Sequence, residues 1–194
     1  IVFDRKYSED AFASKLLAQE VRDDLGILIT SSRSSKGHKI RLKRILNPRP
    51  TERSVQGYRI SVSPTEIVVS GESGDGIFNG VQTLRQLVRA NHFGKAIQAC
   101  TIIDEPVLTR RGWQHDISRG PIPSMDYLRK EIRLLSEFKL NFFTLYTEHV
   151  FRLKKHPEIA PKDGITAEQM TELANYGKQY HVEVAGNFQS FGHF

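Results

Sequence analysis

The sequence predicts an α/β fold in two parts, an α+β domain over residues 1–103 and a parallel sheet over residues 104–194. Three observations lead to this fold class. Residues 1–103 mix helical apolar stripes with runs of alternating apolar and polar side chains, as in half-buried strands. A boundary falls near Asp104-Glu105-Pro106, and the pattern then becomes strand, helix, strand, helix, strand. Strands that alternate with helices at this spacing form right-handed βαβ units, and therefore a parallel sheet.

The first part is expected to begin with a helix. Ser8 is its predicted N-cap, Gly26 closes it, and one face is apolar, formed by Phe12, Leu16, Leu17 and Val21. Strands are expected next, at residues 27–30, 39–43 and, as a hairpin, 57–63 with 66–70. A glycine-rich loop at 71–76 then leads into a second helix, but its glycines lack the spacing of a phosphate-binding loop.

The second part is expected to hold three strands, at residues 110–116, 140–146 and 182–187. Ser124 is the predicted cap of the helix between the first two strands. A long loop follows the second strand, at residues 151–164. Thr166 and Gln169 then form a capping box that opens the second helix.

Composition excludes several classes of protein. Apolar residues make up 39% and charged residues 26% of the 194 residues, which excludes intrinsic disorder. No apolar run approaches the roughly 20 residues that span a bilayer, so no membrane span is expected. Cys100 is the single cysteine, so neither an internal disulfide nor a cysteine-based zinc cluster is expected. The first residues, Ile1-Val2-Phe3-Asp4, indicate a trimmed chain from which any secretion signal is gone.

The net charge of +6 is concentrated in residues 33–53, which hold eight Lys and Arg and one acidic residue, Glu52. Basic and apolar residues alternate in Lys39-Ile40-Arg41-Leu42-Lys43, as in a strand with one face in water. Two interpretations remain open: the cations protect a solvated edge strand from pairing, or they form a strip that binds a polyanion. The strip lacks interleaved aromatic residues for stacking bases, so no nucleic acid partner is expected.

Polar side chains of functional types follow all three strands of the second part. Ligands of parallel α/β folds bind beyond the carboxyl ends of the strands. The end of the first strand carries His115, Asp116 and Arg119, and that of the second carries Tyr146, Glu148 and His149. The end of the third carries Asn187, Gln189 and His193. No serine or cysteine lies in a nucleophile elbow, and no metal-ligand spacing is present, so no metal is expected. Sugar recognition fits better, because it needs an arginine fork, carboxylates and aromatic faces, available in Arg111, Asp116, Glu148, Trp113 and Tyr146.

These residues carry a resemblance to a known family. The segment from Arg111 to Arg119 resembles the R-G-x-x-x-D-(I/V)-(S/A)-R strand of family 20 glycoside hydrolases, the β-N-acetylhexosaminidases. Similar segments occur in the family's order along the chain, at 57–60, 76–87, 104–106, 139–141, 146–148 and 187–193. Within 76–87, residues 80–87 match the family's specific string G-x-Q-T-L-x-Q-L.

The resemblance implies the family's non-catalytic α+β domain at 1–103 and the first three β/α units of a (β/α)8 barrel, truncated, at 104–194. It also implies an activity: retaining, substrate-assisted removal of terminal β-linked N-acetylglucosamine or N-acetylgalactosamine. In that mechanism the 2-acetamido oxygen attacks the anomeric carbon, and no cofactor takes part. The expected partner is an N-acetylhexosaminide oligosaccharide or glycoconjugate, and the expected location is the periplasm or the medium.

The resemblance further implies roles for individual residues. Arg111 matches the arginine that holds the 3- and 4-hydroxyls of the sugar. Glu148 and His193 match an acid–histidine pair that supports the catalytic acid. The other substrate-binding candidates are Asp116, Tyr146 and Gln189. For Asp116, bracing the mouth of the barrel together with Arg119 is the alternative role.

The chain departs from the family pattern in two places. Tyr146-Thr147-Glu148 stands where the second strand usually ends in H-x-(T/S)-D, and the catalytic Asp-Glu pair is expected beyond His193. We therefore expect the 194-residue chain alone to be inactive, and its open sheet edges to favour self-association. Two other functions stay open: another glycosidase with the same accessory domain (O-GlcNAcase-like or α-glucuronidase-like), or a non-catalytic module that binds carbohydrate or a polyanion.

Overall fold

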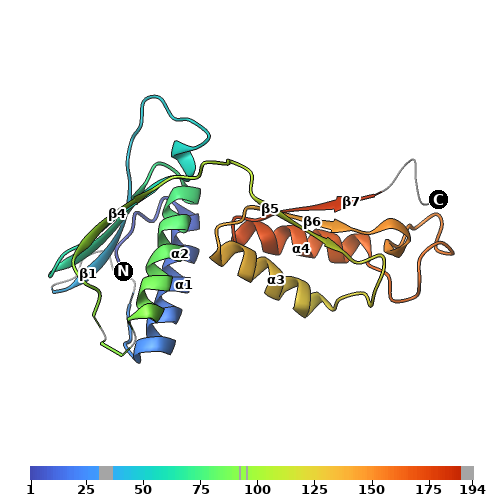
Figure 1. Ribbon diagram of the computed structural model, residues 1–194, viewed down its shortest axis with the longest axis horizontal. Coiled ribbons are helices and arrows are strands. Elements are labelled where there is room, and N and C mark those ends of the chain that lie inside the picture. Colours follow the sequence, from blue (N-terminus) through green and yellow to red (C-terminus); the bar gives the residue numbers. More distant parts are fainter. Residues whose placement is uncertain (31–36, 92, 95, 189–194) are drawn as a thin grey trace. The chain divides into compact units, whose positions relative to one another are not determined.

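The computed structural model describes residues 1–30, 37–91, 93–94 and 96–188. The chain divides into two compact units, unit 1 (Ile1–Thr109) and unit 2 (Arg110–Phe194) (Figure 1). The predicted boundary, after residue 103, lies inside the last strand of unit 1. The segment beyond that strand stays with unit 1 because Arg53 donates hydrogen bonds to the Pro106 carbonyl and to Glu105, each at 2.9 Å.

Unit 1 is a four-stranded sheet with two helices on one of its faces (Figure 1). Its strands lie in the order β1 (Lys39–Arg44), β3 (Glu66–Gly71), β2 (Tyr58–Val62) and β4 (Cys100–Asp104). β1 is parallel to β3, whereas β2 is antiparallel to both β3 and β4. The helices are α1 (Ser8–Leu25) and α2 (Gly74–Ala90), and a short 3-10 helix, η1 (Ser54–Gln56), precedes β2. The core of unit 1 includes the fully buried side chains Leu17, Ile60, Val69, Ile77 and Leu84.

Local patterns predict most elements of unit 1. The first helix, the basic edge strand and the hairpin are confirmed, and Gly26 ends α1 with a left-handed φ of 68°. Tyr7 rather than Ser8 is the N-cap of α1, and its side chain makes no capping hydrogen bond. α2 begins inside the glycine-rich loop because Ser73 caps it, accepting a hydrogen bond from the backbone of Gly76 at 3.3 Å.

The strand predicted at residues 27–30 is wrong. These residues form no strand, and Leu28 is 80% exposed. The outer edge of β1, which such a strand needs for pairing, is held by Val2, which donates to Ile40 at 2.8 Å and accepts from Leu42 at 2.9 Å. Conversely, the sequence pattern did not reveal β4, which completes the sheet beside β2.

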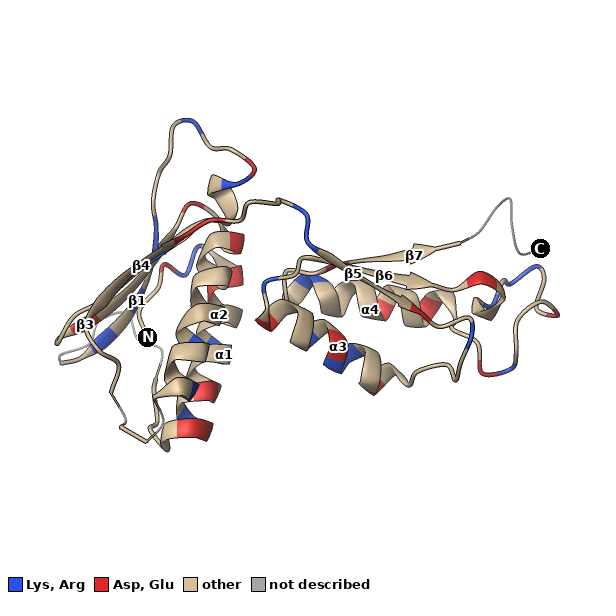
Figure 2. Cartoon of the chain, viewed as in Figure 1, with Lys and Arg blue, Asp and Glu red and all other residues tan. Residues whose placement is uncertain are grey.

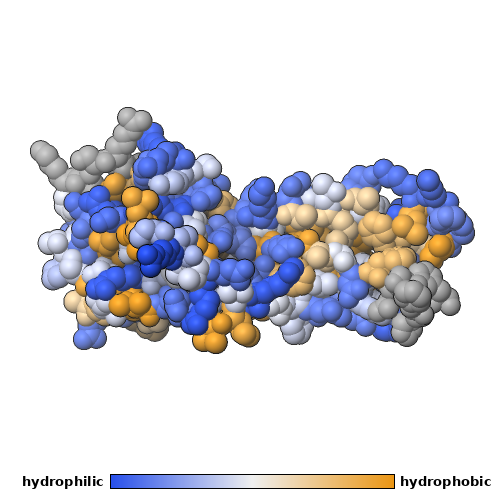
Figure 3. Space-filling model, turned by 90° about the horizontal axis from the view of Figure 1, so that it is seen from above, coloured by the Kyte–Doolittle hydropathy of each residue, from blue (hydrophilic) through white to orange (hydrophobic). Residues whose placement is uncertain are grey.

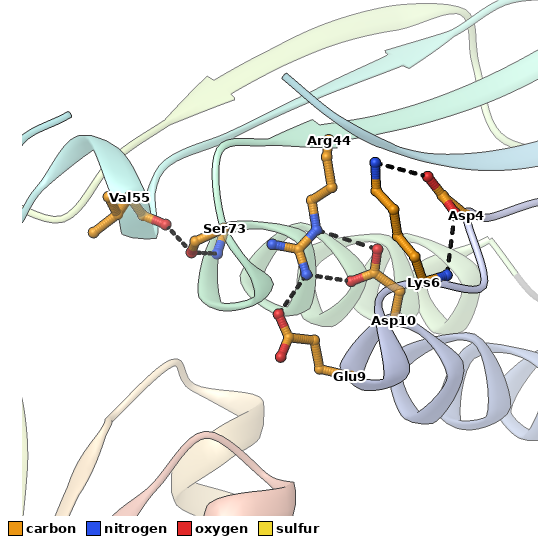
Figure 4. Close-up of polar contacts among 8 residues, drawn as sticks. Asp4, Lys6, Glu9, Asp10, Arg44, Val55 and Ser73 are labelled. Atoms are coloured by element: carbon orange, nitrogen blue, oxygen red, sulfur yellow. Dashed lines mark hydrogen bonds and ion pairs between the residues drawn. The ribbon is translucent and has the colours of Figure 1, made fainter. Parts of the chain in front are cut away.

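A buried ion pair joins α1 to β1 (Figure 4). The carboxylate of Asp10, a residue only 1% exposed in the first turn of α1, accepts hydrogen bonds from Nε and Nη2 of Arg44 at 3.2 and 2.8 Å. Arg44 also donates to Glu9 at 2.6 Å and lies over the ring of Tyr7, 4.6 Å from its centroid. These contacts fix the start of α1 against the end of β1.

Unit 2 has three parallel strands in the order β5 (Gly112–Asp116), β6 (Phe142–Tyr146) and β7 (Glu183–Asn187). α3 (Met125–Glu137) links β5 to β6, α4 (Ala167–Gln179) links β6 to β7, and both helices lie on one face of the sheet (Figure 1). A short 3-10 helix, η2 (Glu148–Val150), follows β6. The predicted α/β class and the parallel strand–helix alternation are confirmed.

The two faces of this sheet differ. One packs on α3 and α4, in a core whose fully buried side chains include Leu128, Ile132, Phe143, Leu145 and Leu173. The other is not covered by the helices, and there β6 presents the partly buried residues Phe142, Thr144 and Tyr146. Figure 3 looks onto unit 2 from the side of the strands, and apolar colours run along its middle.

Both helices of unit 2 begin at their predicted caps. The Ser124 hydroxyl accepts from the backbone of Tyr127 at 3.3 Å, and Thr166 with Gln169 forms a complete capping box. These caps are local signals, so they are legible in the sequence without knowledge of the tertiary structure.

The capping box gives a first testable prediction. Thr166→Ala is expected to lower the free energy of unfolding by about 1 kcal/mol, because the Gln169 N–H loses the acceptor that lies 3.2 Å away. Urea unfolding followed by circular dichroism measures the loss. Thr171→Ala is the matched control, since exposed Thr171 donates only to the Ala167 carbonyl of the same helix. Equal losses in both variants would contradict the capping role.

Candidate active site at the carboxyl ends of β5, β6 and β7

The carboxyl ends of the three strands of unit 2 lie side by side. Their last residues, Asp116, Tyr146 and Asn187, are in register across the sheet. They alternate with the helix-facing core residues and so lie on the face that α3 and α4 leave uncovered. This edge of a parallel α/β sheet is where ligands bind.

Asp116 organises the turn after β5. Its Oδ1 accepts a hydrogen bond from the Ser118 hydroxyl at 2.7 Å and another from the Ser118 backbone at 2.8 Å. These hydrogen bonds hold the pKa of Asp116 below its ordinary value, so its carboxylate is ionised at neutral pH. The Ile117 N–H donates to the Tyr146 carbonyl at 3.2 Å, which ties the turn to β6. Arg119 comes directly after Ser118 and therefore lies in the same turn.

Glu148 lies immediately after Thr147 at the end of β6, with a left-handed φ of 39° and a side chain only 4% exposed. Arg119 donates to both carboxylate oxygens, from Nη2 to Oε1 at 3.0 Å and from Nη1 to Oε2. The Tyr146 hydroxyl donates to Oε1 at 2.6 Å. The hydrogen bonds and charge of Glu148 raise the pKa of Arg119, so the guanidinium stays charged. A left-handed glutamate is strained, and such strain is often found at functional sites.

Backbone hydrogen bonds hold this turn in place. The Thr147 N–H donates to the Asn187 carbonyl at 3.1 Å, and the Val150 N–H donates to the Thr147 carbonyl at 2.8 Å. Glu148 is therefore held between β6 and β7 while it binds Arg119. The Arg119 side chain remains 57% exposed, so a buried carboxylate orients an accessible guanidinium. A guanidinium held in this way presents N–H donors of fixed direction to the oxygen atoms of a ligand.

A family model described as "Glycosyl hydrolase family 20, domain 2" matches residues 1–105, more than half of the chain. The chain belongs to glycosyl hydrolase family 20. The predicted family is thereby confirmed on unit 1, the part without the strand-end site.

Two curated relatives of this family 20 chain are β-hexosaminidases. The "Beta-hexosaminidase" of Porphyromonas gingivalis is 26% identical over an alignment of length 206, which takes in 93% of this chain and 26% of that protein. The "Beta-hexosaminidase subunit alpha" of Rattus norvegicus is 25% identical over an alignment of length 158, which takes in 76% of this chain and 30% of that protein. The chain thus spans less than a third of these relatives.

Solved structures share the fold of the family 20 chain. The GlcNAc complex of a Streptomyces plicatus β-hexosaminidase mutant has a TM-score of 0.77 at 23% identity, covering 93% of this chain and 39% of that one. The family 20 β-N-acetylhexosaminidase of Streptomyces coelicolor has a TM-score of 0.78 at 23% identity, covering 95% and 40%. Identities this low show the fold alone.

Arg111, the expected sugar clamp, lies at the opposite end of β5 from this site. It precedes the strand. Its side-chain Nε donates to the Lys139 carbonyl at 2.8 Å, and its backbone N–H donates to Asn141 Oδ1, also at 2.8 Å. Since a strand advances by about 3.3 Å per residue, Arg111 and Asp116 are about 16 Å apart along the sheet. Arg111 therefore lies away from the strand-end site, and its role as the clamp stays a prediction. The arginine at the carboxyl edge is Arg119, and the signal that distinguishes it is its place after the strand.

Other candidates from the sequence lie elsewhere in the family 20 chain. His115 faces α3, where its Nδ1 lies 2.9 Å from Glu131, so it packs under the sheet rather than at the site. Trp113 is 52% exposed on edge strand β5. Gln189 and His193 lie outside the described residues, and their roles stay predictions.

Neither a metal centre nor a membrane span is found in the described part of the chain. No three His, Cys, Asp or Glu residues there are grouped so that they could hold a metal ion. No helix among the described residues has the length and hydrophobicity to cross a bilayer.

Proposed function

We propose that the protein carrying this chain is a retaining, substrate-assisted β-N-acetylhexosaminidase that removes terminal β-linked N-acetylglucosamine or N-acetylgalactosamine. The observation that carries the proposal is the Arg119–Glu148–Tyr146 network at the carboxyl edge of a parallel sheet. Family membership and the names of the curated relatives support it. One structural relative is a complex with GlcNAc, which supports a carbohydrate substrate.

The same proposal makes unit 2 the first three β/α units of a (β/α)8 barrel. Parallel sheets occur with both faces covered, yet the helices of unit 2 cover only one. In a closed barrel the uncovered side chains of β6 face the interior, where they pack in layers with residues of other strands. Closure also pairs the outer edges of β5 and β7, which have no partner among the described strands.

In the proposed reaction the 2-acetamido oxygen of the substrate attacks the anomeric carbon as the glycosidic C–O bond breaks. An acid donates a proton to the leaving oxygen, and water then opens the oxazolinium intermediate with retention. The residues of this chain bind the substrate in this reaction. Arg119 donates hydrogen bonds to the sugar hydroxyls, Glu148 orients Arg119, and Tyr146 holds Glu148. Asp116 keeps the first turn in shape through Ser118, so the bracing role suits it better than sugar contact.

The supporting pair of Glu148 with His193 is part of the proposal. A carboxylate that accepts a hydrogen bond from an imidazole can orient that ring behind a catalytic acid and raise its basicity. We assign the acid itself, and the residue that orients the acetamido group, to the family's Asp-Glu pair after the fourth strand.

Hydrolysis of chromogenic glycosides by the full-length protein tests the function. We expect release from the β-N-acetylglucosaminide and the β-N-acetylgalactosaminide, with the β-anomer as first product by NMR. The β-glucoside, which lacks the acetamido nucleophile, should not be cleaved at a comparable rate. Equal turnover of the glucoside, or an α-anomeric first product, would refute the substrate-assisted mechanism.

A further inference from the structure

The sheet face of unit 1 that α1 and α2 leave uncovered is rich in positive charge. Leu42 and Ile60 are buried under the helices, so the alternate positions of β1 and β2 lie on the opposite face. Four of those positions are cations, namely Lys39, Arg41, Lys43 and Arg59. In Figure 2, β1 at the edge of the sheet carries the blue colour of Lys and Arg.

Strand register places the cations as a two-dimensional array. Lys43 and Arg59 are both partners of Ser70 on β3, one from each side. Because neighbouring strands lie about 4.8 Å apart, their Cα atoms are separated by about 10 Å across the sheet. Along β1, successive cations are spaced by about 7 Å, two residues of strand. Arg59 lies outside the basic segment of the sequence and joins the array only through the sheet.

Acidic side chains neutralise only part of this array. Glu66 is the one acid that the described strands place on this face, and it pairs with Arg41 at 2.9 Å and with Lys39 at 3.9 Å. Lys43 and Arg59 are exposed and make no ion pair with any described residue. Two accessible cations therefore flank Ser70 on a face of net positive charge.

We propose that this face binds an acidic polysaccharide, a glycan that carries sulfate or carboxylate groups. The cations pair with those groups, and the hydroxyls of Ser61, Ser70 and Thr101, on the same face, exchange hydrogen bonds with sugar hydroxyls. No side chain that the described strands place on this face is aromatic, so it offers no platform for stacking nucleic acid bases. The binding surface is distinct from the strand-end site of unit 2 and does not depend on the proposed hydrolysis.

Heparin binding by the 194-residue chain tests the proposal. We expect measurable affinity that falls as salt rises, and a loss of about fivefold or more in the double variant Lys43→Gln/Arg59→Gln. The control is Lys15→Gln/Lys130→Gln, which makes the same change in net charge at exposed positions on α1 and α3. The control should bind heparin as the unaltered chain does, and circular dichroism should show both variants folded.

Three outcomes would overturn the proposal. They are absence of heparin binding at low salt, equal losses in the two double variants, and equally tight binding of single-stranded DNA of matched charge. The last outcome would make the face a nucleic acid surface instead. Failure of the full-length protein to hydrolyse N-acetylhexosaminides leaves this binding untouched, so the two proposals fail separately.

Discussion

Replacing Arg119 with Ala in the full-length protein is expected to lower kcat/KM for a β-N-acetylglucosaminide by about 100-fold or more. Arg119 is the accessible guanidinium at the carboxyl edge, and the buried carboxylate of Glu148 fixes its direction through both oxygens. Preorganised charged donors lose little freedom when substrate binds, so their removal affects both binding and rate. Steady-state kinetics with the chromogenic N-acetylglucosaminide measures the loss.

Two companion variants make this result specific. Arg133→Ala removes an exposed arginine of α3 that donates to the Tyr176 hydroxyl at 2.7 Å, and it should keep kcat/KM within about twofold. Arg111→Ala tests the arginine at the other end of β5. If Arg111→Ala lost activity at unchanged stability while Arg119→Ala did not, the sugar clamp would belong to Arg111 after all.

Replacing Arg44 with Ala is expected to lower the free energy of unfolding by about 3 kcal/mol. The Asp10 carboxylate is buried and loses two hydrogen bonds from the guanidinium (Figure 4). Its position in the first turn of α1 offsets part of that loss, because the positive end of the helix dipole favours a carboxylate. Urea unfolding monitored by circular dichroism gives the difference.

The control for Arg44 is Arg49→Ala, the same change at an exposed position between β1 and η1. It should change the free energy of unfolding by no more than about 0.5 kcal/mol. The double variant Asp10→Leu/Arg44→Met should recover part of the stability, since it removes the buried charge together with its partner. If Arg44→Ala were no more harmful than Arg49→Ala, the buried pair would not stabilise the fold.

Elements governed by neighbouring residues could be predicted. The caps at Ser124 and Thr166 and the end of α1 at Gly26 depend on side chains within a few positions, so periodicity and capping residues suffice. The strand expected at residues 27–30 failed because Val2, far away in the chain, holds the edge of β1. Similarly, no local pattern indicates that Asp10 is buried, since its partner Arg44 is 34 residues away.

The sequence by itself determined the family, the parallel order of unit 2 and the strand ends that carry polar side chains. Only the tertiary structure shows that Arg119, and not Arg111, contacts the buried carboxylate of Glu148. Arg111 and Arg119 flank the same strand and look equivalent in a motif, but a strand separates its two ends in space. The register of β5 with β6 brings Arg119 to Glu148, 29 residues away, and leaves Arg111 bound to the backbone of Lys139. The backbone hydrogen bonds between β5 and β6 place Arg119 beside Glu148. These hydrogen bonds join segments that are distant in the chain, so no single segment of the sequence indicates them.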